Sequence, residues 1–185
     1  MILEDALCDI KDRLLNTGYF TEVFEYCSMF EVNGVTRPMY SIGNELIDVH
    51  NFDRNGSGYI RKTGAVSITR ANLPVTVACD GKIGLVEVKF PLRGVFAVPT
   101  KKLGGNGYSN DLLFFELLEV FHGAEISVNG ATCVTKARGY ETDRDKIYKE
   151  EVNSGNEPIL ELAYIYIDFD LIFTGSVECF KTTCY

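Results

Sequence analysis

The chain has 185 residues, of which 46% are hydrophobic and 24% are charged, and its formal net charge at pH 7 is −8. This composition is typical of a folded globular protein and excludes a mainly disordered chain. No apolar run reaches the roughly 18 residues that a membrane span requires, and the N-terminus lacks the basic and apolar pattern of a signal peptide. We therefore expect residues 1–185 to form a single α+β domain that is made in a cytoplasm and has no membrane partner.

The charge is unevenly distributed along the chain. Residues 54–102 hold nine basic and two acidic residues, a net charge of +7, whereas the remainder holds nine basic and 24 acidic residues, a net charge of −15. One surface of such a chain could pair with the opposite surface of another copy. Alternatively, folding interleaves these charges into an ordinary mixed surface, because a segment of sequence need not become a patch in space.

The cysteines and histidines predict neither a metal site nor a cofactor. The six cysteines show no C-x-x-C pair, so we expect reduced, mostly buried thiols in place of zinc ligands or a disulfide scaffold. Cys179 and Cys184 lie five residues apart and could cross-link on oxidation. His50 and His122 occur in unrelated contexts, and we expect both to be structural or surface residues.

The first part of the chain predicts one helix followed by strands. Residues Ile2 to Leu15 carry apolar side chains at helical spacing, with acidic residues in the early turns and basic residues later. The aromatic-rich segment from Tyr19 to Phe30 could form a strand or an irregular connection. Pro38 to Val49 and Tyr59 to Arg70 are typical of strands, and we expect the hairpin at about 50–70 to project from the domain.

The loop that starts at Asp53 resembles the first part of a calcium-binding EF-hand loop. Asp53, Asn55 and Ser57 have the spacing of the first ligands, and Gly58 stands at the sharp turn. However, Gly64 occupies the position that needs a bidentate glutamate, and the flanking segments are typical of strands. A glycine-tipped hairpin with basic neighbours explains the same residues, so we predict no metal site in this loop.

The middle of the chain predicts a hairpin, a loop and a buried helix. Val75 to Cys79 and Gly84 to Val98 are typical of paired strands, and Pro91 predicts an edge position or a bulge, with a bend nearby. The glycine-rich loop after Lys101 lacks the pattern of a phosphate-binding loop. Asn110 to His122 predicts a helix that is apolar on most sides, placed between the sheet and the first helix or against another subunit.

The last third of the chain is organised around one long strand. Glu125 to Val128 and Thr132 to Ala137 predict a hairpin around an Asn-Gly turn, and residues 139–157 predict a charged connection or a short surface helix. Ile159 to Phe173 alternates between an apolar and a polar face, as a strand with one face on the core does. Because this strand exceeds the usual length of about five or six residues, we expect part of it to project beyond its sheet, and residues 175–185 to form an arm.

Together these elements predict an α+β fold with a mixed, mainly antiparallel sheet, two helices packed on it, projecting hairpins and a C-terminal arm. The order of the elements, with the apolar helix Leu112 to Phe121 before the closing strand ILELAYIYIDFDLIF, resembles the tail-terminator and tail-completion proteins of tailed bacteriophages. More loosely, it resembles other neck proteins that form rings. The resemblance covers most of the chain and is architectural, since no short diagnostic motif accompanies it.

The resemblance implies a non-enzymatic structural subunit of a virion, assembled in the host cytoplasm. Such a subunit forms a ring of six or twelve copies around the DNA channel, between the head-side connector and the tail, and contacts neighbouring neck and tail proteins. On this hypothesis, four basic residues contact an acidic neighbouring subunit or lie near the DNA: Arg54, Arg61, Lys62 and Arg70.

Two other functions stay open at this stage. An enzyme would need convergent acid, base or nucleophilic groups, and the only tidy carboxylate pair is Asp168 and Asp170, which we interpret as solvent-facing partners of lysine or arginine. The other alternative is a free-standing soluble binding module, calcium-dependent through the Asp53 loop.

Overall fold

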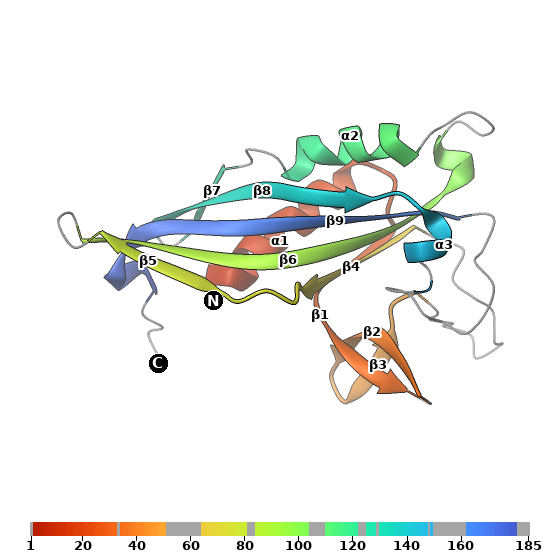
Figure 1. The fold of residues 1–185 in the computed structure, drawn as a ribbon, viewed down its shortest axis with the longest axis horizontal. Helices are drawn as coiled ribbons and strands as arrows, with labels where there is room; N and C mark the ends of the chain where they lie inside the picture. The colour runs from red at the N-terminus through yellow and green to blue at the C-terminus, as the bar shows by residue number, and fades with distance from the viewer. Residues whose placement is uncertain are drawn as a thin grey trace.

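The computed structural model describes residues 2–32, 34–50, 64–80, 84–103, 110–121, 125–128, 130–147, 149 and 162–180 (Figure 1). The helices are α1 (Ile2–Asn16), α2 (Asn110–Phe121) and α3 (Arg144–Ile147), with single 3-10 helices at Thr100–Leu103 and Val177–Phe180. The strands are β1 (Glu22–Val32), β2 (Val35–Ile42), β3 (Glu45–Asp48), β4 (Ala65–Arg70), β5 (Thr76–Asp80), β6 (Leu85–Pro99), β7 (Glu125–Val128), β8 (Ala131–Glu141) and β9 (Leu162–Ser176).

The strands form one mixed, mostly antiparallel sheet. Neighbouring strands follow the order β3-β2-β1-β4-β6-β9-β8-β7, and β5 also pairs with β6. β1 and β4 run parallel to each other, and the other described pairs are antiparallel. The predicted α+β fold class is therefore confirmed.

The centre of the sheet is the antiparallel pair of β6 and β9, each 15 residues long. Their register runs from Leu85 opposite Ser176 to Pro99 opposite Leu162 without a shift. On its other side, β9 pairs with β8 from Tyr166 to Thr174. The expectation that the long strand projects beyond its sheet is wrong, because β6 is long enough to pair with every residue of β9.

The hydrophobic core lies on one face of this central pair, where α1 and α2 pack (Figure 1). The predicted alternation along the long strand is confirmed, since its core-facing residues from Ile165 to Phe173 are 0% exposed at every second position. Leu7, Ile10 and Leu14 of α1 face the same core at the three- and four-residue spacing of one helix stripe. From α2, three fully buried side chains join them: Leu113, Leu117 and Phe121.

Pro91 lies inside β6 without interrupting it. β4 pairs with β6 as far as Leu92, and β5 pairs with it from Lys89 onward, so Pro91 stands where one neighbour ends and the next begins. Its carbonyl oxygen accepts a hydrogen bond from the amide of Ala71 (3.1 Å) in the connection between these strands. The N–H and C=O of one strand residue point to the same side, so the missing N–H of Pro91 faces this interruption in the ladder. Pro91 is therefore at an edge only on the side of β6 where β4 ends and β5 begins. On the other side the register with β9 has no bulge.

The second half of β1 leaves the main sheet. Up to Cys27, β1 pairs in parallel with β4, and from Ser28 onward it pairs with β2. The register shifts between Phe24 and Cys27, and Tyr26 has a positive φ of 59° at this point. Such an irregularity bends a strand, and the part of the chain beyond it projects from the sheet (Figure 1). We call this part, residues 26–48, the lobe.

The expected strand from Pro38 to Val49 is two strands, β2 and β3, so that expectation is wrong. The turn between them contains Gly43, whose φ of 60° lies in the left-handed region, and Ile42 pairs with Glu45 across it. A two-residue Gly-Asn connection is a common hairpin turn, because glycine adopts positive φ without a steric penalty. The segment from Tyr19 to Phe30, for which the sequence allowed a strand or an irregular connection, contributes most of β1.

Several expected projections are partly or wholly outside the described residues. Of the hairpin at about 50–70, residues 51–63 lie outside them, and residues 65–70 form β4 between β1 and β6. Residues 139–147 complete β8 and form α3, whereas residues 150–157 are not described. Residues 175–180 finish β9 and form a 3-10 helix whose Phe180 packs against the core, so this part is not an arm.

The helix and hairpin predicted after residue 109 are present. α2 ends at Phe121, and β7 and β8 form the hairpin with Val128 opposite Ala131. On the face of the sheet opposite the core, Ile147 of α3 packs with Val95, Ala97, Leu162 and Tyr164 in a second, smaller cluster.

Candidate assembly surfaces

The structure places one of the four predicted contact residues. Arg70 is the last residue of β4, and its side chain is exposed with no ion-pair partner among the residues that the structure describes. Arg54, Arg61 and Lys62 lie outside the described residues.

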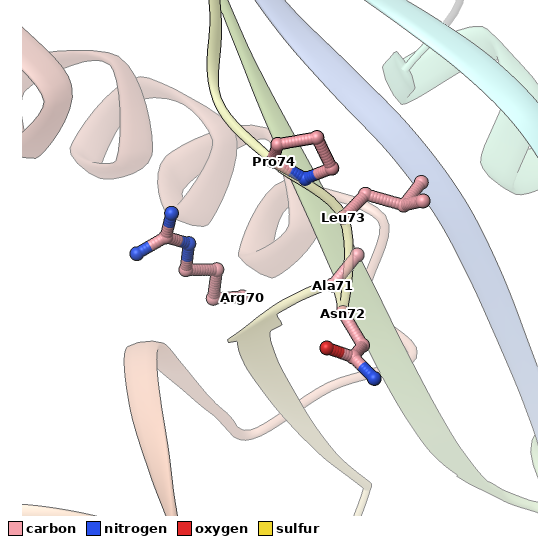
Figure 2. A pocket seen from close by; sticks show the side chains of 5 residues that line it. All are labelled: Arg70, Ala71, Asn72, Leu73 and Pro74. Carbon is pink, nitrogen blue, oxygen red and sulfur yellow. The ribbon is translucent and has the colours of Figure 1, made fainter.

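Arg70 lines a hollow of about 530 Å³ where β4 ends and the connection to β5 begins (Figure 2). Its other lining residues are Ala71, Asn72, Leu73 and Pro74. Figure 2 shows that the Arg70 side chain points away from those of Asn72 and Leu73. A ligand site usually has polar groups that converge on one point, so we interpret this hollow as the notch between two successive neighbours of β6.

Two basic residues of the 54–102 section, Lys89 and Arg93, are neutralised within the chain. Arg93 donates two hydrogen bonds to the Asp168 carboxylate, at 2.7 and 2.9 Å. Lys89 Nζ lies 2.9 Å from one Asp170 oxygen, and Arg138 Nε lies 2.7 Å from the other. Folding thus brings Lys89 and Arg93 beside carboxylates more than 70 residues away, as the alternative of interleaved charges predicts.

Asp168 and Asp170 point from β9 to the face opposite the core. Both have basic partners, as predicted, but Asp170 is only 1% exposed, so the expectation of a solvent-facing pair is wrong for it. Because each carboxylate is held by cations, we find no free acid or base here. The Arg93 guanidinium also lies 4.2 Å from the centre of the Tyr166 ring, within the range of a cation–π contact.

The lobe exposes several large apolar side chains. Tyr26, Met29, Phe30, Ile42 and Leu46 are between 42% and 53% exposed. Monomeric proteins expose single apolar side chains routinely, but clusters of them often mark contact surfaces. The aromatic and β-branched pattern around residues 22–42 was the sequence signal for the lobe. The sequence did not predict the lobe, because it allowed either a strand or an irregular connection at Tyr19 to Phe30 and indicated one strand in place of two at Pro38 to Val49.

A groove of about 400 Å³ runs between the lobe and α1. Lys11 and Leu15 of α1 line one side, and Tyr40 and Ile42 of β2 are on the other, with residues 21–24 between them. Lys11 Nζ lies 3.0 Å from a Glu25 oxygen. Partial burial disfavours the charge on Lys11, but the hydrogen bond and charge of Glu25 outweigh it and raise the Lys11 pKa. The groove is therefore a mixed apolar and ion-paired surface at the base of the lobe.

β5 is an exposed edge strand. In the described part of the chain it pairs only with β6, and all five of its residues are exposed. Val77 is 62% exposed, more than any other large hydrophobic side chain described. An edge of this kind presents unpaired main-chain N–H and C=O groups to any strand that approaches it.

The outer side of α2 is also apolar. Leu112 and Phe115, three residues apart, are 52% and 61% exposed, whereas Phe114 is buried and its ring stacks on that of Tyr140 with a centroid separation of 3.7 Å. The helix therefore has one stripe on the core and part of another on the surface. α2 packs on the core beside α1 and is not enclosed between α1 and the sheet, because its outer side is exposed. A contact of that side with another subunit stays a prediction.

One buried pair has the residue types of a catalytic dyad. His50 Nε2 lies 2.9 Å from Ser67 Oγ, but the two residues are 2% and 0% exposed. A nucleophile must be reachable by its substrate, so we interpret this pair as structural. His50 was expected to be structural or on the surface, and the structural alternative holds; nothing in the sequence indicates its pairing with Ser67.

No group of three or more His, Cys, Asp or Glu residues in the described ranges could hold a metal ion. Among the helices formed by these residues, none has the length and apolar character needed to cross a membrane. The Asp53 loop lies outside the described residues. Searches among known protein families, curated proteins and solved structures find no match to this chain.

Proposed function

We propose that this chain is a non-enzymatic structural subunit that assembles with copies of itself. In its specific form, the proposal is a ring of six or twelve copies at the neck or tail end of a tailed phage, around the DNA channel. The architectural resemblance supports the specific form. The exposed surfaces described above support the more general one.

The lobe is the observation that carries the proposal. It is a three-stranded extension that projects from the sheet (Figure 1) and exposes five large apolar side chains. Burial of apolar surface contributes roughly 25 cal/mol per Å², so a partner that covers these side chains gains a substantial contact energy. A projecting element that inserts into a neighbour suits a ring, in which each copy contacts the next through two different surfaces.

The charge distribution supports this arrangement less strongly than the sequence suggested. Lys89 and Arg93 are satisfied by Asp170 and Asp168 inside the chain, and Lys102 donates to the carbonyl oxygen of Gly18 at 2.6 Å. Arg70 stays exposed and has no partner in the described part of the chain. Electrostatic contacts between subunits would therefore rest on Arg70, on the exposed Lys101 and on basic residues outside the described ranges, and apolar contacts through the lobe take the larger part.

Native mass spectrometry across a concentration series, with negative-stain imaging of the same samples, tests the proposal. We expect closed rings of six or twelve copies in the wild type. Phe30→Ser with Leu46→Ser should reduce ring formation, whereas Glu31→Gln, a change on the same lobe that keeps its apolar side chains, should not.

A chain that stays monomeric at every concentration would contradict the ring, and rings that tolerate the double substitution would exclude the lobe as the contact. A calorimetric titration of the same samples with millimolar calcium distinguishes the structural subunit from a calcium-dependent binding module. The structural subunit should give no heat of binding, whereas the binding module should give one.

A further inference from the structure

We propose that β5 is a pairing site for β5 of a second copy, in an antiparallel register around a two-fold axis at Ala78. The inference deepens the proposed function and rests on it for the expectation that copies of the chain meet. It names a second contact surface, separate from the lobe, and the partner that this surface takes.

β5 lacks the usual protection of an edge strand. Natural edges are guarded by lysine, proline, bulges or very short length. β5 reads Thr-Val-Ala-Cys-Asp, pairs with β6 in an unshifted register over all five residues, and is exposed throughout. The other edge strands, β3 and β7, are four residues each and contain Glu45, Asp48 and Glu125. Of these edges, β5 offers the longest stretch without a charge, from Thr76 to Cys79.

The main-chain N–H and C=O groups of β5 point alternately toward β6 and away from it. The carbonyl oxygen of Asp80 accepts a hydrogen bond from the amide of Gly84 (2.9 Å) inside the β5–β6 hairpin. Main-chain groups alternate in direction along a strand, so Thr76, Ala78 and Asp80 turn theirs toward β6. The carbonyl of Pro91 points to the β4 and β5 side of β6, and those of Lys89 and Glu87, two and four residues before it, point the same way. Lys89 and Glu87 stand opposite Thr76 and Ala78, which agrees with this assignment. The amides and carbonyls of Val77 and Cys79 therefore point outward.

One register between two copies of β5 satisfies the outward main-chain groups of Val77 and Cys79. With the axis at Ala78, Val77 stands opposite Cys79 of the second copy, and Cys79 stands opposite its Val77. In an antiparallel ladder, residues opposite each other at such positions exchange two hydrogen bonds. Two such pairs use every outward amide and carbonyl of Val77 and Cys79 in both copies, and Ala78 faces Ala78 between them.

The same register also brings complementary side chains of the two copies together. Val77 and Cys79 share one face, so Val77, the most exposed large hydrophobic side chain among the described residues, is covered by another apolar side chain. On the other face, Thr76 stands opposite Asp80 of the second copy, where its hydroxyl can donate to the carboxylate. Asp80 is the only charged residue in β5, and it does not meet its own copy, so no like charges face each other. This self-complementarity identifies a second copy as the occupant.

Cross-linking tests the register. In a background where Cys8, Cys79, Cys179 and Cys184 are replaced by serine, Ala78→Cys should form a disulfide-linked dimer on mild oxidation, because non-hydrogen-bonded partners have Cα atoms about 4.5 Å apart. Thr76→Cys is the matched control on the same face. Its two copies would lie about 13 Å apart across the axis, so it should give no dimer. Equal cross-linking at both positions would overturn the register.

Sedimentation equilibrium tests the contact itself. Val77→Pro removes an outward N–H that β6 does not use, and proline is tolerated at such an edge position. It deletes two of the four hydrogen bonds between copies, so association should weaken roughly tenfold or more. Val77→Thr keeps the N–H and should associate like the wild type. Equal association of the proline and threonine variants would overturn the pairing.

The two proposals can fail separately. Rings that form without any Ala78→Cys dimer would keep the proposed function and overturn the β5 pairing. Ala78→Cys dimers that pass the Thr76→Cys control, in a chain that never forms rings, would keep the pairing and overturn the ring. Cross-links from Ala78→Cys to a cysteine placed in β3 or β7, with no symmetric dimer, would assign the β5 edge to a different strand and overturn the two-fold.

Discussion

The imidazole Nε2 of His50 and the hydroxyl of Ser67 form a buried contact of 2.9 Å that joins the chain two residues after the lobe to the middle of β4. His50 Nδ1 is buried and has no hydrogen-bond partner in the described part of the chain. A protonated imidazole has two N–H donors to satisfy, so this environment favours the neutral form. Burial lowers the pKa of His50 to about 4, against a smaller opposing effect of the Asp48 carboxylate.

This contact predicts a loss of stability in mild acid. Unfolded His50 takes up a proton near its ordinary pKa of 6.5, whereas folded His50 does so only near 4. The contribution of neutral His50 is therefore fully present above about pH 6.5 and is lost as the pH falls toward 4, by about 3 kcal/mol in total. Urea unfolding at pH 7, 5.5 and 4 measures it. His50→Gln should show a shallower decline over this window, and equal slopes for the two proteins would contradict the prediction.

The two carboxylates on β9 predict different costs of neutralisation. Asp170 is 1% exposed and lies between Lys89 and Arg138, whereas Asp168 is 20% exposed and pairs, among the described residues, with Arg93. We expect Asp170→Asn to lower the free energy of unfolding by about 2 to 3 kcal/mol and Asp168→Asn by about 1 kcal/mol. The cost at Asp170 stays moderate because the Lys89 side chain is 41% exposed and can turn to water.

Chemical denaturation of the two variants at pH 7 checks this order. A triple variant with Asp170→Leu, Lys89→Met and Arg138→Met serves as a control. It should be more stable than Asp170→Asn, because an apolar cluster needs no ion pair. A larger loss for Asp168→Asn than for Asp170→Asn would show that burial does not set the cost.

Gly64 predicts a steric requirement at the start of β4. A Cβ atom added there would stand 2.2 Å from the carbonyl oxygen of Tyr19, a main-chain atom that cannot move alone. Gly64→Ala should therefore destabilise the protein by at least about 2 kcal/mol. Gly139→Ala is the matched control, because nothing lies within 4 Å of its added Cβ and its φ is not positive. Thermal unfolding compares them, and a similar Tm for both variants would count against the close contact.

The thiols predict a clear order of reactivity. Burial raises the pKa of Cys27 and of Cys133 to about 12, so neither forms the reactive thiolate near neutral pH. Cys8 and Cys79 are exposed, which corrects the expectation that the thiols are mostly buried. Alkylation at pH 8 followed by peptide mapping should label Cys8 and Cys79 first and leave Cys27 and Cys133 unlabelled until the chain unfolds. Early labelling of Cys133 would contradict its burial.

Periodicity predicted the elements whose environment is set by their own residues. The alternation before Phe173 placed the core face of β9, and the stripe of Leu7, Ile10 and Leu14 placed α1, because each pattern reports directly which side is buried. Where the environment is set by distant segments, the same patterns were less informative. Asp170 is polar in sequence, but it is buried because Lys89 and Arg138 arrive from two other strands.

The candidate surfaces depended on such distant relationships. The lobe exists because β1 changes partner at Tyr26, whose positive φ no residue pattern indicates. Pro91 indicated an edge, but only the end of β4 at Arg70 shows which side of β6 is open there. Of the predicted contacts, Arg70 alone is placed, and the exposure of β5 could not be read from its sequence, because five-residue strands of this composition occur at both centres and edges of sheets.

The outward direction of every second peptide in β5 gives the strand an alternating pattern of solvent exchange. In a lone chain, the amide hydrogens of Thr76, Ala78 and Asp80 are held by β6 and should exchange slowly, whereas those of Val77 and Cys79 meet water and should exchange quickly. Once a second strand occupies the edge, the fast pair becomes slow and the alternation disappears. The backbone of β5 thus reports, in the wild-type protein and without any substitution, whether its edge is occupied.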